Sequence, residues 1–426
     1  MRVPALGAAA QPTGLIARSV PMQDLDVIVI GGGAAGIGAA RTLADAGKSV
    51  LLVEADTRLG GRARTEHVDS LALDLGAGWL HSAEHNPWVE IAALHGFALD
   101  QTLPRWREQW RGLGFGKSEQ RAAAAAFEAF ETRLRDDPPP GDRAGAALVP
   151  GSPWSVWIDA ISGFVNGTDT AKLSIADYLA YEDAATETDW RVPAGYGALV
   201  AAQANGLRTA LATPVTAIDR SGTQLKIETP RGTLTAAQVI VTASTDVLAR
   251  GAIAIGGHDE VLHAAAALPL GMADKLFLAI DHGEDELDDN AHLLGDPRNA
   301  ITGSYTLRPF GRPVIEVMFG GEGAREMAER GLAGAADFAI EELCALLGGQ
   351  WRRRLRLLAG SAWSRETHIR GGYSHALPGR AAARQVLATP IDPRIRFAGE
   401  ACSTSEFSTV HGAYKTGVAA ARALLG

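Results

Sequence analysis

One stretch near the N-terminus constrains the fold more than any other, because it joins an apolar run directly to a glycine-rich loop. Residues 26–36 read DVIVIGGGAAG and contain the pattern GxGxxG, and an acidic residue, Glu54, follows eighteen positions after Gly36. An apolar run without alternation is typical of a strand buried on both faces of a parallel sheet. We therefore predict a βαβ dinucleotide-binding unit, with a strand at residues 27–30, a helix at 35–46 and a second strand at 49–53.

Each part of this unit has a physical task. Gly31 permits the tight turn, Gly33 lets the backbone approach a pyrophosphate, and Gly36 allows the helix and strand to pack closely. The helix N-terminus at Ala35 offers unpaired N–H groups to the phosphates. Glu54 is expected to accept the ribose hydroxyls. A glycine-rich turn that binds nothing is the alternative, but the strand, the helix and the acid at this spacing together favour dinucleotide binding.

Segments at both ends of the chain indicate which dinucleotide is bound. LGGRART occupies residues 59–65, and LDLGAGWLH occupies residues 73–81. At the C-terminal end, RFAGE at residues 396–400 is followed by STVHGAY at residues 408–414. These segments resemble the motifs of the flavin-containing amine oxidase family, in patches that span residues 24–426. The resemblance implies FAD rather than NAD as the cofactor.

The N-terminal segments also have a chemical rationale of their own. Arg62 and Arg64 carry planar forks of donors that suit the two charges of a pyrophosphate, and a surface pair of arginines is the alternative. Small residues at positions 76–78 let the backbone run against a flat isoalloxazine ring before the bulky Trp79.

The C-terminal segment predicts a second contact with the flavin. A strand at residues 395–398 leads to a helix at about residues 409–425, whose positive N-terminus suits the flavin edge where negative charge develops on reduction. The resemblance further implies a backbone contact between Val215 and the adenine, and a flavin-walling segment at Trp363. The cofactor-contacting residues that we predict are Gly31, Gly33, Ala35, Gly36, Glu54, Ala55, Gly61, Arg62, Gly76, Ala77, Gly78, Trp79, Val215, Trp363, Gly399, Glu400, Thr409 and Val410.

The resemblance implies four residues on the substrate side of the flavin. Tyr373 matches one half of the family's aromatic cage, whereas Thr409 stands in place of the second tyrosine, as in spermine oxidases and lysine-specific histone demethylases. Lys275 matches a lysine that is water-bridged to flavin N5, although most lysines are exposed. His81 matches the WxH segment of polyamine oxidases, and a satisfied core histidine is the alternative.

Cysteine usage bears on the compartment and on how the flavin is held. Cys344 and Cys402 are the two cysteines, too few for a disulfide framework and suited to a reducing cytoplasm. Monoamine oxidases tether their flavin through a cysteine just before the cage tyrosine, and Gly372 holds that position here. The resemblance therefore implies noncovalent FAD, and we predict no metal site.

Length and composition predict two lobes. With 426 residues, 46% of them hydrophobic, the chain exceeds one ordinary core. Strand patterns at residues 213–218, 225–229 and 237–242 extend the first unit. We expect an α/β fold in which a discontinuous Rossmann-type FAD-binding lobe comprises residues 24–100, 193–250 and 390–426, a mixed α+β substrate lobe comprises residues 101–192 and 251–389, and residues 1–23 are a disordered leader.

Net charge and hydropathy limit the partners. A net charge of −9 argues against nucleic acid and is compatible with cationic substrates. No run approaches the roughly 18 apolar residues of a membrane span, and the chain stops at Gly426 without the hydrophobic tail of the mitochondrial monoamine oxidases. We expect a soluble cytoplasmic protein, with a homodimer left open, whose partners are a small-molecule amine and O2.

The family chemistry is hydride transfer from the carbon next to an amine nitrogen to flavin N5, with reoxidation by O2 to H2O2. Seven of the nine tryptophans precede residue 191, which indicates either an aromatic amine pocket or ordinary helix packing. The pattern of His81 with Thr409 favours polyamines over monoamines, cyclic amines and alkaloids, and an amino acid would need an arginine such as Arg105 or Arg107. A carotenoid- or protoporphyrinogen-type desaturase and a non-catalytic flavin-binding protein are the alternatives outside amine oxidation.

Overall fold

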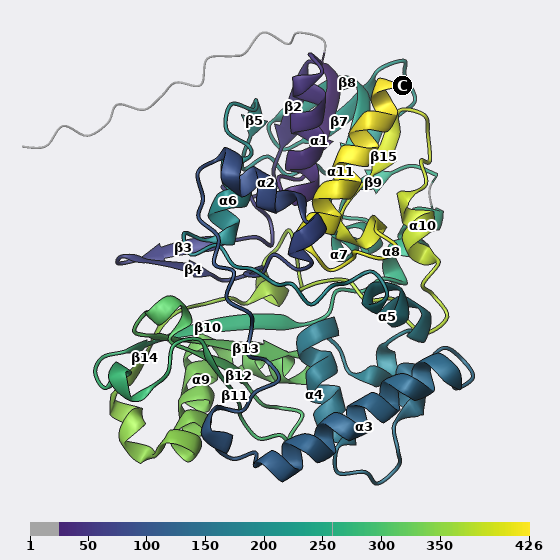
Figure 1. Ribbon diagram of the computed structural model, residues 1–426. Helices are drawn as coiled ribbons and strands as arrows, with labels where there is room; N and C mark the ends of the chain where they lie inside the picture. Colours follow the sequence, from purple (N-terminus) through teal and green to yellow (C-terminus); the bar gives the residue numbers. More distant parts are fainter. Residues whose placement is uncertain (1–24, 258) are drawn as a thin grey trace, which may run out of the picture.

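The first sheet contains the predicted dinucleotide-binding unit. In the computed structural model, which describes residues 25–257 and 259–426, β1 (Leu25–Ile30) and β2 (Val50–Val53) are parallel neighbours joined by α1 (Ala34–Asp45) (Figure 1). All but one of the side chains of these two strands are buried, as in a sheet covered on both faces. The predicted strand, helix and second strand are therefore present to within two residues at each end.

This sheet has eight strands, in the order β5-β2-β1-β8-β7-β6-β9 with β15 also paired to β8. The strands β5, β2, β1, β8 and β15 run parallel, whereas β7 is antiparallel to both of its neighbours. The strands not yet described are β5 (Thr209–Ala210), β6 (Ala217–Asp219), β7 (Leu225–Thr229), β8 (Gly232–Val241), β9 (Ala254–Ile255) and β15 (Ile395–Phe397).

Helix α1 packs side by side with α11 (Val410–Leu425) against this sheet (Figure 1). Their close approach depends on glycine, because a Cβ atom at Gly417 would lie 1.9 Å from the carbonyl oxygen of Ala35. A Cβ atom at Gly38 would likewise lie 2.9 Å from the ring of Tyr414. The packing brings the N-terminal ends of both helices to the wall of one cavity.

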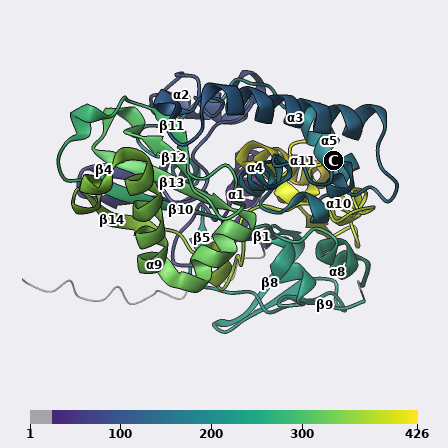
Figure 2. The ribbon, with the colours of Figure 1, turned by 90° about the horizontal axis from the view of Figure 1, so that it is seen from below.

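The second sheet is antiparallel throughout, in the order β11-β12-β13-β10-β14. Its strands are β10 (Ala273–Ile280), β11 (Ala291–Leu294), β12 (Ser304–Leu307), β13 (Val314–Gly320) and β14 (Leu355–Gly360). All eight residues of β10 are buried, and α9 (Gly321–Leu347) shares an apolar core with the sheet. Figure 2 shows α9 on one side of this sheet and the long helix α3 (Lys117–Asp136) on the other.

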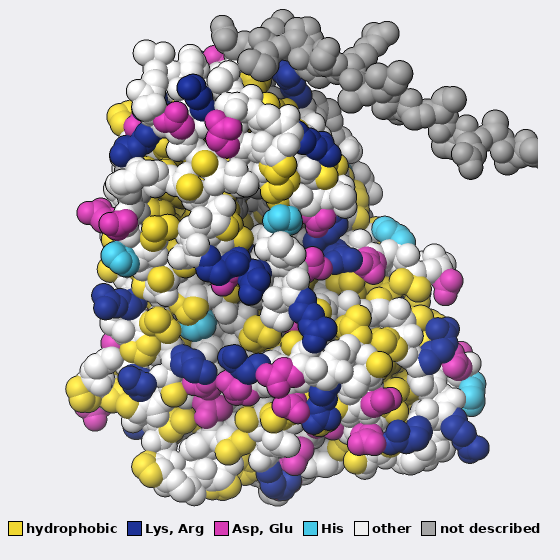
Figure 3. Space-filling model, turned by 180° about the vertical axis from the view of Figure 1, so that it is seen from behind, with side chains coloured by type: hydrophobic (Ala, Val, Ile, Leu, Met, Phe, Trp, Pro, Cys, Tyr) yellow, Lys and Arg dark blue, Asp and Glu magenta, His cyan; other side chains and the backbone are white. Residues whose placement is uncertain are grey.

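A smaller apolar cluster joins α3 to α4 (Ser155–Asn166) and α5 (Ile175–Glu182). The remaining elements are the hairpin of β3 (Thr65–Val68) and β4 (Leu71–Asp74) and the helices α2 (Pro87–Leu94), α6 (Tyr196–Ala202), α7 (Thr245–Ala249), α8 (Asp259–Ala266) and α10 (Ala383–Ala388). On the face drawn in Figure 3, positive and negative side chains are interspersed. No helix in residues 25–257 and 259–426 is long and apolar enough to cross a membrane.

The α/β fold class predicted from the sequence is confirmed, with one local error. The strand predicted at residues 213–218 is wrong over its first four residues, because Pro214 has no N–H for a ladder and the N–H of Thr213 bonds to the carbonyl of Glu54 instead. Beyond residue 250, β9 and α8 still pack with the first sheet. The domain boundaries stay a prediction, and the leader predicted at residues 1–23 lies outside the described residues.

Candidate active site

A cavity of about 1430 Å³ connects the glycine-rich loop after β1 to the second sheet. Its volume exceeds the roughly 300–1,000 Å³ of an ordinary ligand pocket, so it can hold a dinucleotide together with a substrate. All of the residues predicted above to contact cofactor or substrate lie in its wall except Gly36 and Arg64. A Cβ atom at Gly36 would lie 1.8 Å from the carbonyl oxygen of Gly31, so this glycine allows the close packing of helix on strand. The contacts of these residues with a cofactor stay predictions.

The glycine-rich loop forms a cradle with room for a pyrophosphate. Gly31 has a φ of 105°, and a Cβ atom there would lie 2.4 Å from the hydroxyl of Thr242. A Cβ atom at Gly33 would meet nothing closer than 3.9 Å, so the backbone is open to a ligand. Gly33 is also the N-cap of α1 and supplies no side chain to its first N–H groups, which leaves them free for an anion.

Arg58 belongs to this cradle, although the sequence reasoning missed it. Its Nη1 donates to the carbonyl of Gly61 at 2.9 Å, while its Nη2 is buried and has no hydrogen-bond partner among the described residues. Burial lowers the pKa of this guanidinium below its usual range. The Nε of Arg58 pairs with Asp56 at 3.3 Å, so Nη2 is the donor that is left for a ligand. A guanidinium donor without a partner, beside a row of free N–H groups, fits a pyrophosphate. The sequence did contain an indication of this role, because Arg58 directly precedes the LGGRART segment.

The two arginines predicted at the pyrophosphate differ in their surroundings. Arg62 lies in the cavity wall and donates to Glu400 at 2.9 Å and to the carbonyl of Gly372 at 2.5 Å. Arg64 is not among the wall residues, and it pairs with Glu366 at 3.0 Å and with Glu66. The expectation that Arg64 faces the pyrophosphate is therefore wrong, because these two carboxylates bind its guanidinium.

Glu54 directly follows β2 and lies in the cavity wall, where a ribose was predicted. Its carboxylate accepts backbone hydrogen bonds from Gly32 at 2.5 Å and from Asp56 at 2.7 Å. Burial raises the pKa of Glu54 despite these two bonds. A carboxylate offers about four lone-pair sites, so sites remain for ribose hydroxyls.

The predicted flavin end of the cavity is shaped by small residues. A Cβ atom at Gly76 would lie 1.8 Å from the carbonyl oxygen of Arg62 and 2.9 Å from the ring of Trp363. The indole of Trp363 is fixed in turn by donating to the carbonyl of Leu75 at 3.1 Å. A Cβ atom at Gly78 would lie 2.9 Å from Nζ of Lys275. A larger residue would clash at either position, so Gly76 allows the backbone to pack against Arg62 and Trp363, and Gly78 makes room for the ammonium of Lys275.

Thr409 has a structural task in addition to its place in the cavity wall. It is the N-cap of α11, where its Oγ1 accepts from the N–H of Gly412 at 2.9 Å and donates to the carbonyl of Glu406 at 2.7 Å. Both bonds stay within the chain around the helix start. The hydroxyl of Thr409 is therefore not free to bind a ligand, and this residue affects the cavity through the small size of its side chain.

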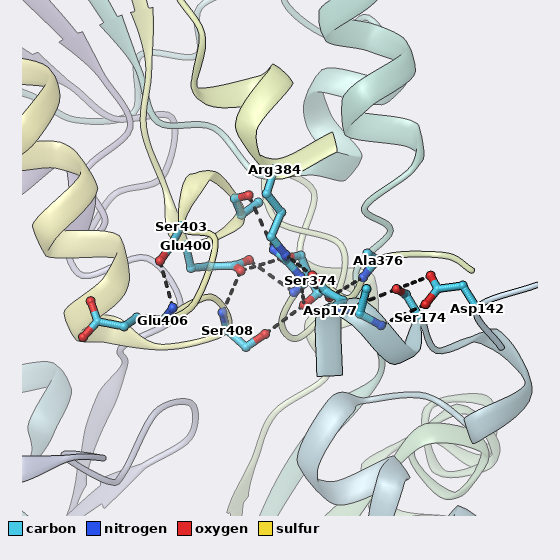
Figure 4. A network of polar contacts seen from close by, with 12 residues as sticks. Asp142, Ser174, Asp177, Ser374, Ala376, Arg384, Glu400, Ser403, Glu406 and Ser408 are labelled. Carbon is cyan, nitrogen blue, oxygen red and sulfur yellow. Dashed lines mark hydrogen bonds and ion pairs between the residues drawn. The ribbon is translucent and has the colours of Figure 1, made fainter. Parts of the chain in front are cut away.

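A buried polar network fixes the loop that carries Tyr373 (Figure 4). Glu400 accepts from Ser374 Oγ at 2.7 Å and from the N–H of Ser408 at 2.9 Å, in addition to the bond from Arg62. Burial alone would raise the pKa of Glu400, but the charges of Arg62 and Arg384 and these hydrogen bonds outweigh it and leave the pKa below its usual value. Glu400 is therefore ionised at neutral pH.

The same network extends from Ser374 to α5 and α10. Arg384 donates to both carboxylate oxygens of Asp177, at 2.6 and 2.8 Å, and to Ser374 Oγ at 2.9 Å (Figure 4). The two partners of this ion pair are buried, with 1% and 2% of their side-chain surface exposed. Asp177 also accepts from the N–H of Ala376 at 2.8 Å. The loop at residues 374–376 is thus anchored to α5, to α10 and to Glu400.

Lys275 has an acidic partner that the sequence reasoning also missed. Its Nζ lies 2.7 Å from Oε1 of Glu316, which projects from the neighbouring strand β13, and both side chains line the cavity. Only 9% of Lys275 is exposed. Glu316 is the one charged residue of β13, and a charge inside an otherwise apolar strand was the available signal.

His81 is paired through one ring nitrogen with a buried carboxylate. Its Nδ1 lies 2.8 Å from Oδ1 of Asp189, a residue that is 7% exposed. The imidazole lies 6.2 Å from the ring of Trp106, which packs edge to face on Trp79 at 4.7 Å. Asp189 was not predicted, because it is far from His81 in the sequence.

The substrate side of the cavity has an aromatic wall. The hydroxyl of Tyr373 donates to the carbonyl of Phe164, and burial raises the pKa of this phenol. Trp79, Trp106 and Trp157 are the members of the predicted tryptophan cluster that line the cavity, and the others lie elsewhere. The remaining aromatic wall residues are Phe115, Phe127, Phe130, Phe164, Tyr178, Tyr181, Trp363 and Phe407.

Two carboxylates stand among these aromatic residues. Glu131 accepts from the hydroxyl of Tyr178 at 2.7 Å, and Glu182 has no ion pair or hydrogen bond with the described residues. Burial, together with the charge of Glu131, raises the pKa of Glu182 to about 6. Of the arginines considered for an amino-acid carboxylate, Arg105 is absent from the wall, and Arg107 is 89% exposed and paired with Glu187.

The geometry defines a dinucleotide cradle that opens into an aromatic chamber, and the comparisons agree with the predicted family. Residues 34–425 match the family described as flavin containing amine oxidoreductase, so the chain belongs to this family. It is an FAD-dependent amine oxidase.

Individual relatives fall within the same class. Over 431 residues the chain is 27% identical to polyamine oxidase 2 of Arabidopsis thaliana, which covers 93% of this chain and 87% of that protein. It is 48% identical over 63 residues to (S)-6-hydroxynicotine oxidase of Paenarthrobacter nicotinovorans, which covers 14% of this chain and 15% of the relative. A structure of putrescine oxidase bound to putrescine shares the fold, with a TM-score of 0.74 at 16% identity and coverage of 95% and 100%.

Proposed function

We propose that this amine oxidase acts on long aliphatic amines that carry a second positive charge, with polyamines as the favoured class. The observation that carries the proposal is a set of carboxylates, Glu131, Glu182 and Glu316, in the wall of the cavity that also contains Lys275 and Tyr373. A partly buried carboxylate without a cationic partner, such as Glu182, favours a cationic ligand. The match to a plant polyamine oxidase over nearly the whole chain supports the same class.

The size of the side chain at residue 409 supports a long substrate. Tyr373 and Thr409 both line the cavity. In the predicted cage, Tyr373 is one aromatic wall and Thr409 stands in place of the second tyrosine. A threonine is much smaller than a tyrosine and leaves room for a chain to pass. A complete two-tyrosine cage would instead suit a small amine held against the flavin.

The FAD is held without a covalent bond in this proposal. Gly372 stands where a tethering cysteine would be, and a Cβ atom there would lie 3.2 Å from the Cβ of Ala273. A larger residue is therefore crowded at this position. Cys402 is buried outside the cavity wall, and burial with the charge of Glu400 raises the pKa of its thiol to about 12, which makes it a poor nucleophile.

The residues have distinct tasks in the reaction. When bound, FAD takes a hydride from the carbon next to the amine nitrogen and passes the electrons to O2 to give H2O2. The aromatic wall excludes water and favours the neutral amine, because burial of an ammonium lowers its pKa. Lys275 and Glu316 hold a polar pair beside Gly78, where the flavin edge is predicted, and His81 hydrogen-bonds the amine. Glu54, Arg58 and the first N–H groups of α1 hold the dinucleotide.

A screen for peroxide release tests the substrate class. The panel contains spermine, N-acetylspermine, putrescine, benzylamine, cyclic alkaloid amines and amino acids. We expect kcat/KM for spermine or N-acetylspermine to exceed that for benzylamine at least about 10-fold, which is about 1.4 kcal/mol of transition-state binding. A wild type that prefers benzylamine, an alkaloid or an amino acid overturns the polyamine class, and peroxide from none of them favours the desaturase or the non-catalytic alternative.

Two further measurements test how the protein is assembled. Acid precipitation should release intact FAD into the supernatant, and flavin absorbance that stays with the pellet would contradict noncovalent binding. A homodimer stays a prediction, which light scattering on the purified flavoprotein would check.

A further inference from the structure

The backbone around His81 fixes its imidazole against one carboxylate. Leu80 and Trp190 form an isolated antiparallel bridge with bonds of 2.7 and 3.2 Å, so the adjacent residues His81 and Asp189 stand opposite each other on a rigid ladder. Asp189 is 7% exposed, and its Oδ1 lies 2.8 Å from Nδ1 of His81. The pairing therefore follows from the fold rather than from two mobile surface side chains.

This contact determines which ring nitrogen carries the proton. An ionised carboxylate only accepts hydrogen bonds, so the neutral imidazole holds its proton on Nδ1 and keeps the lone pair on Nε2. No bond to Nε2 occurs among the residues the structure describes, and His81 lines the cavity with 37% of its side chain exposed. The free lone pair thus belongs to a group in contact with the cavity.

Other charged groups near His81 do not compete for its proton. His411 of α11 is buried, and burial followed by the charges of His81, Lys415 and His85 lowers its pKa to about 3, so it is neutral. Glu406 faces the same region but lies 2.5 Å from Lys415, 3.6 Å from His85 and 3.7 Å from His411. Asp189 is therefore the carboxylate that acts on the His81 ring.

The reaction needs such an acceptor, because amines of this class enter mainly as ammonium ions. An aliphatic ammonium has a pKa of about 10, and in that form the nitrogen has no lone pair to support loss of a hydride from the neighbouring carbon. Transfer of one proton to Nε2 breaks an N–H bond and leaves its electron pair on the amine nitrogen. The resulting imidazolium, with a proton on each nitrogen, is stabilised by the Asp189 carboxylate and later releases its proton to solvent.

We propose that His81 is the proton acceptor for the substrate ammonium and that Asp189 is a positioning residue that holds His81 in the accepting tautomer. This inference rests on the proposed function, since it assumes a cationic amine in the cavity. The pair of His81 and Asp189 then makes catalysis depend on pH. It also makes Asp189 necessary for activity, although Asp189 is not in the cavity wall.

The pH profile of kcat/KM for the preferred amine tests the kinetic part. Asp189→Asn should lower kcat/KM by about 100-fold near pH 7, since general-base catalysis contributes typically 10²–10⁴-fold. The defect should shrink towards about pH 10, where the amine arrives already neutral. Glu84→Gln is the matched control, because the exposed Glu84 bonds to Thr186 and Thr188 of the same segment without touching His81. A loss of equal size at every pH would overturn the proposal, because a merely structural role has that signature.

Two additional readouts keep the test independent of turnover and of folding defects. His81→Gln should lower kcat/KM near pH 7 by as much as Asp189→Asn does, and the double variant should lower it no further than either single variant. Additive losses of kcat/KM would show that the two residues act independently and would count against the proposal. Long-range 1H–15N spectra of histidine-labelled flavoprotein should show His81 protonated on Nδ1 in the wild type and shifted towards the Nε2–H tautomer in Asp189→Asn. A wild-type His81 protonated on Nε2 would overturn the inference even if no amine is oxidised, whereas failure of the proposed function alone leaves this spectrum unchanged.

Discussion

Lys275 illustrates how the meaning of one residue depends on its partner. Most lysines at the start of a strand are exposed. Here the apolar residues that follow Lys275 favoured the prediction that its side chain faces inward. The structure adds that Glu316 binds the ammonium at 2.7 Å, so the two charges enter the cavity as a neutral pair. The pair compensates for the burial of a lysine that has 9% of its surface exposed.

Replacement of this lysine should separate catalysis from cofactor binding. Lys275→Met is expected to retain FAD but to slow flavin reduction by the amine, reoxidation by O2, or both, by at least about 10-fold, which corresponds to about 1.4 kcal/mol of barrier. Stopped-flow absorbance of the two half-reactions measures this. Lys226→Met, at an exposed position of β7, is the control. If both half-reactions of Lys275→Met match the wild type, the assignment of Lys275 is wrong.

The variant also leaves Glu316 without its cationic partner, which destabilises the protein for a separate reason. Adding Glu316→Gln in the same chain should recover the denaturation midpoint without recovering the rate. If the midpoint and the rate both recovered, the slow reaction of Lys275→Met would come only from the unpaired Glu316 carboxylate.

Arg58 and Arg64 form a matched pair that tests the phosphate end. Arg58 has a buried unpartnered Nη2 in the cavity wall, whereas Arg64 is outside the wall and paired with two glutamates. A hydrogen bond to a charged group is worth about 1.5–3 kcal/mol, so Arg58→Met should raise the Kd for FAD by about 10- to 100-fold. Arg64→Met should change it little. Flavin fluorescence during rebinding to the apoprotein measures both constants, and equal effects would remove Arg58 from the site.

Among the elements, α11 shows how one residue serves the fold and the site together. Its N-cap, Thr409, uses its hydroxyl in two bonds within the chain and presents only its small size to the cavity. A tyrosine at residue 409 would therefore fill the predicted half-cage and also remove a cap worth about 1 kcal/mol. Any change in substrate preference caused by Thr409→Tyr must be compared with the preference of Thr409→Ala. The alanine variant also removes the helix cap, but it leaves the cavity open at residue 409.

The network around Glu400 couples three elements to the loop of Tyr373, and it predicts a pH dependence. The folded-state pKa of Glu400 lies below its unfolded value, so its stabilising contribution is fully present above the ordinary glutamate pKa of about 4.3 and is lost as the pH falls through the folded value. Glu400→Gln should cost roughly 3 kcal/mol at pH 7, because it breaks a buried pair with Arg62.

The difference between wild type and Glu400→Gln should stay constant above about pH 5 and narrow below about pH 4. Urea midpoints of the two proteins across this range measure it. Glu366→Gln, which removes a partner of Arg64 on the half-exposed side, is the control and should show a much smaller difference. A difference between wild type and Glu400→Gln that widens on acidification would contradict the assigned direction.

For the whole molecule, the sequence predicted what is local and missed what is brought together by the fold. The βαβ unit and the flavin segments are contiguous in the sequence, so Gly31 and Glu54 were predicted from their spacing and Gly76 from the resemblance of its segment to the family motif. Asp189 and Glu316 were missed, because the partner of each lies about 40 to 110 positions away in the sequence. The charge of Glu316 inside an apolar strand marked it as unusual, but it did not indicate that Lys275 was its partner. The strand predicted at residues 213–218 failed because alternation was read across a proline.

The cavity is lined by residues from both sheets, so the proposed preference for long amines depends on the whole molecule. Glu182 lies at the end of α5, among aromatic wall residues, and its pKa is raised to about 6. It is therefore neutral below and charged above about pH 6. Attraction to the second ammonium of a polyamine should follow this charge, and KM for spermine should fall as the pH rises through about 6, apart from changes shared with a monoamine.

Glu182→Gln should remove this trend and raise KM for spermine at pH 8 by about 10-fold, while KM for benzylamine, which has one positive charge, stays within about 2-fold. Binding of the distal ammonium by Glu182 requires that KM rise for spermine and not for benzylamine, because a loss of packing at α5 would raise both KM values. Asp136→Asn, an exposed change at the end of α3, controls for the general loss of one negative charge nearby. If Glu182→Gln raises both KM values equally, or leaves the pH trend for spermine intact, Glu182 does not bind the distal ammonium, and Glu131 is the next carboxylate to test, because Glu316 is paired with Lys275.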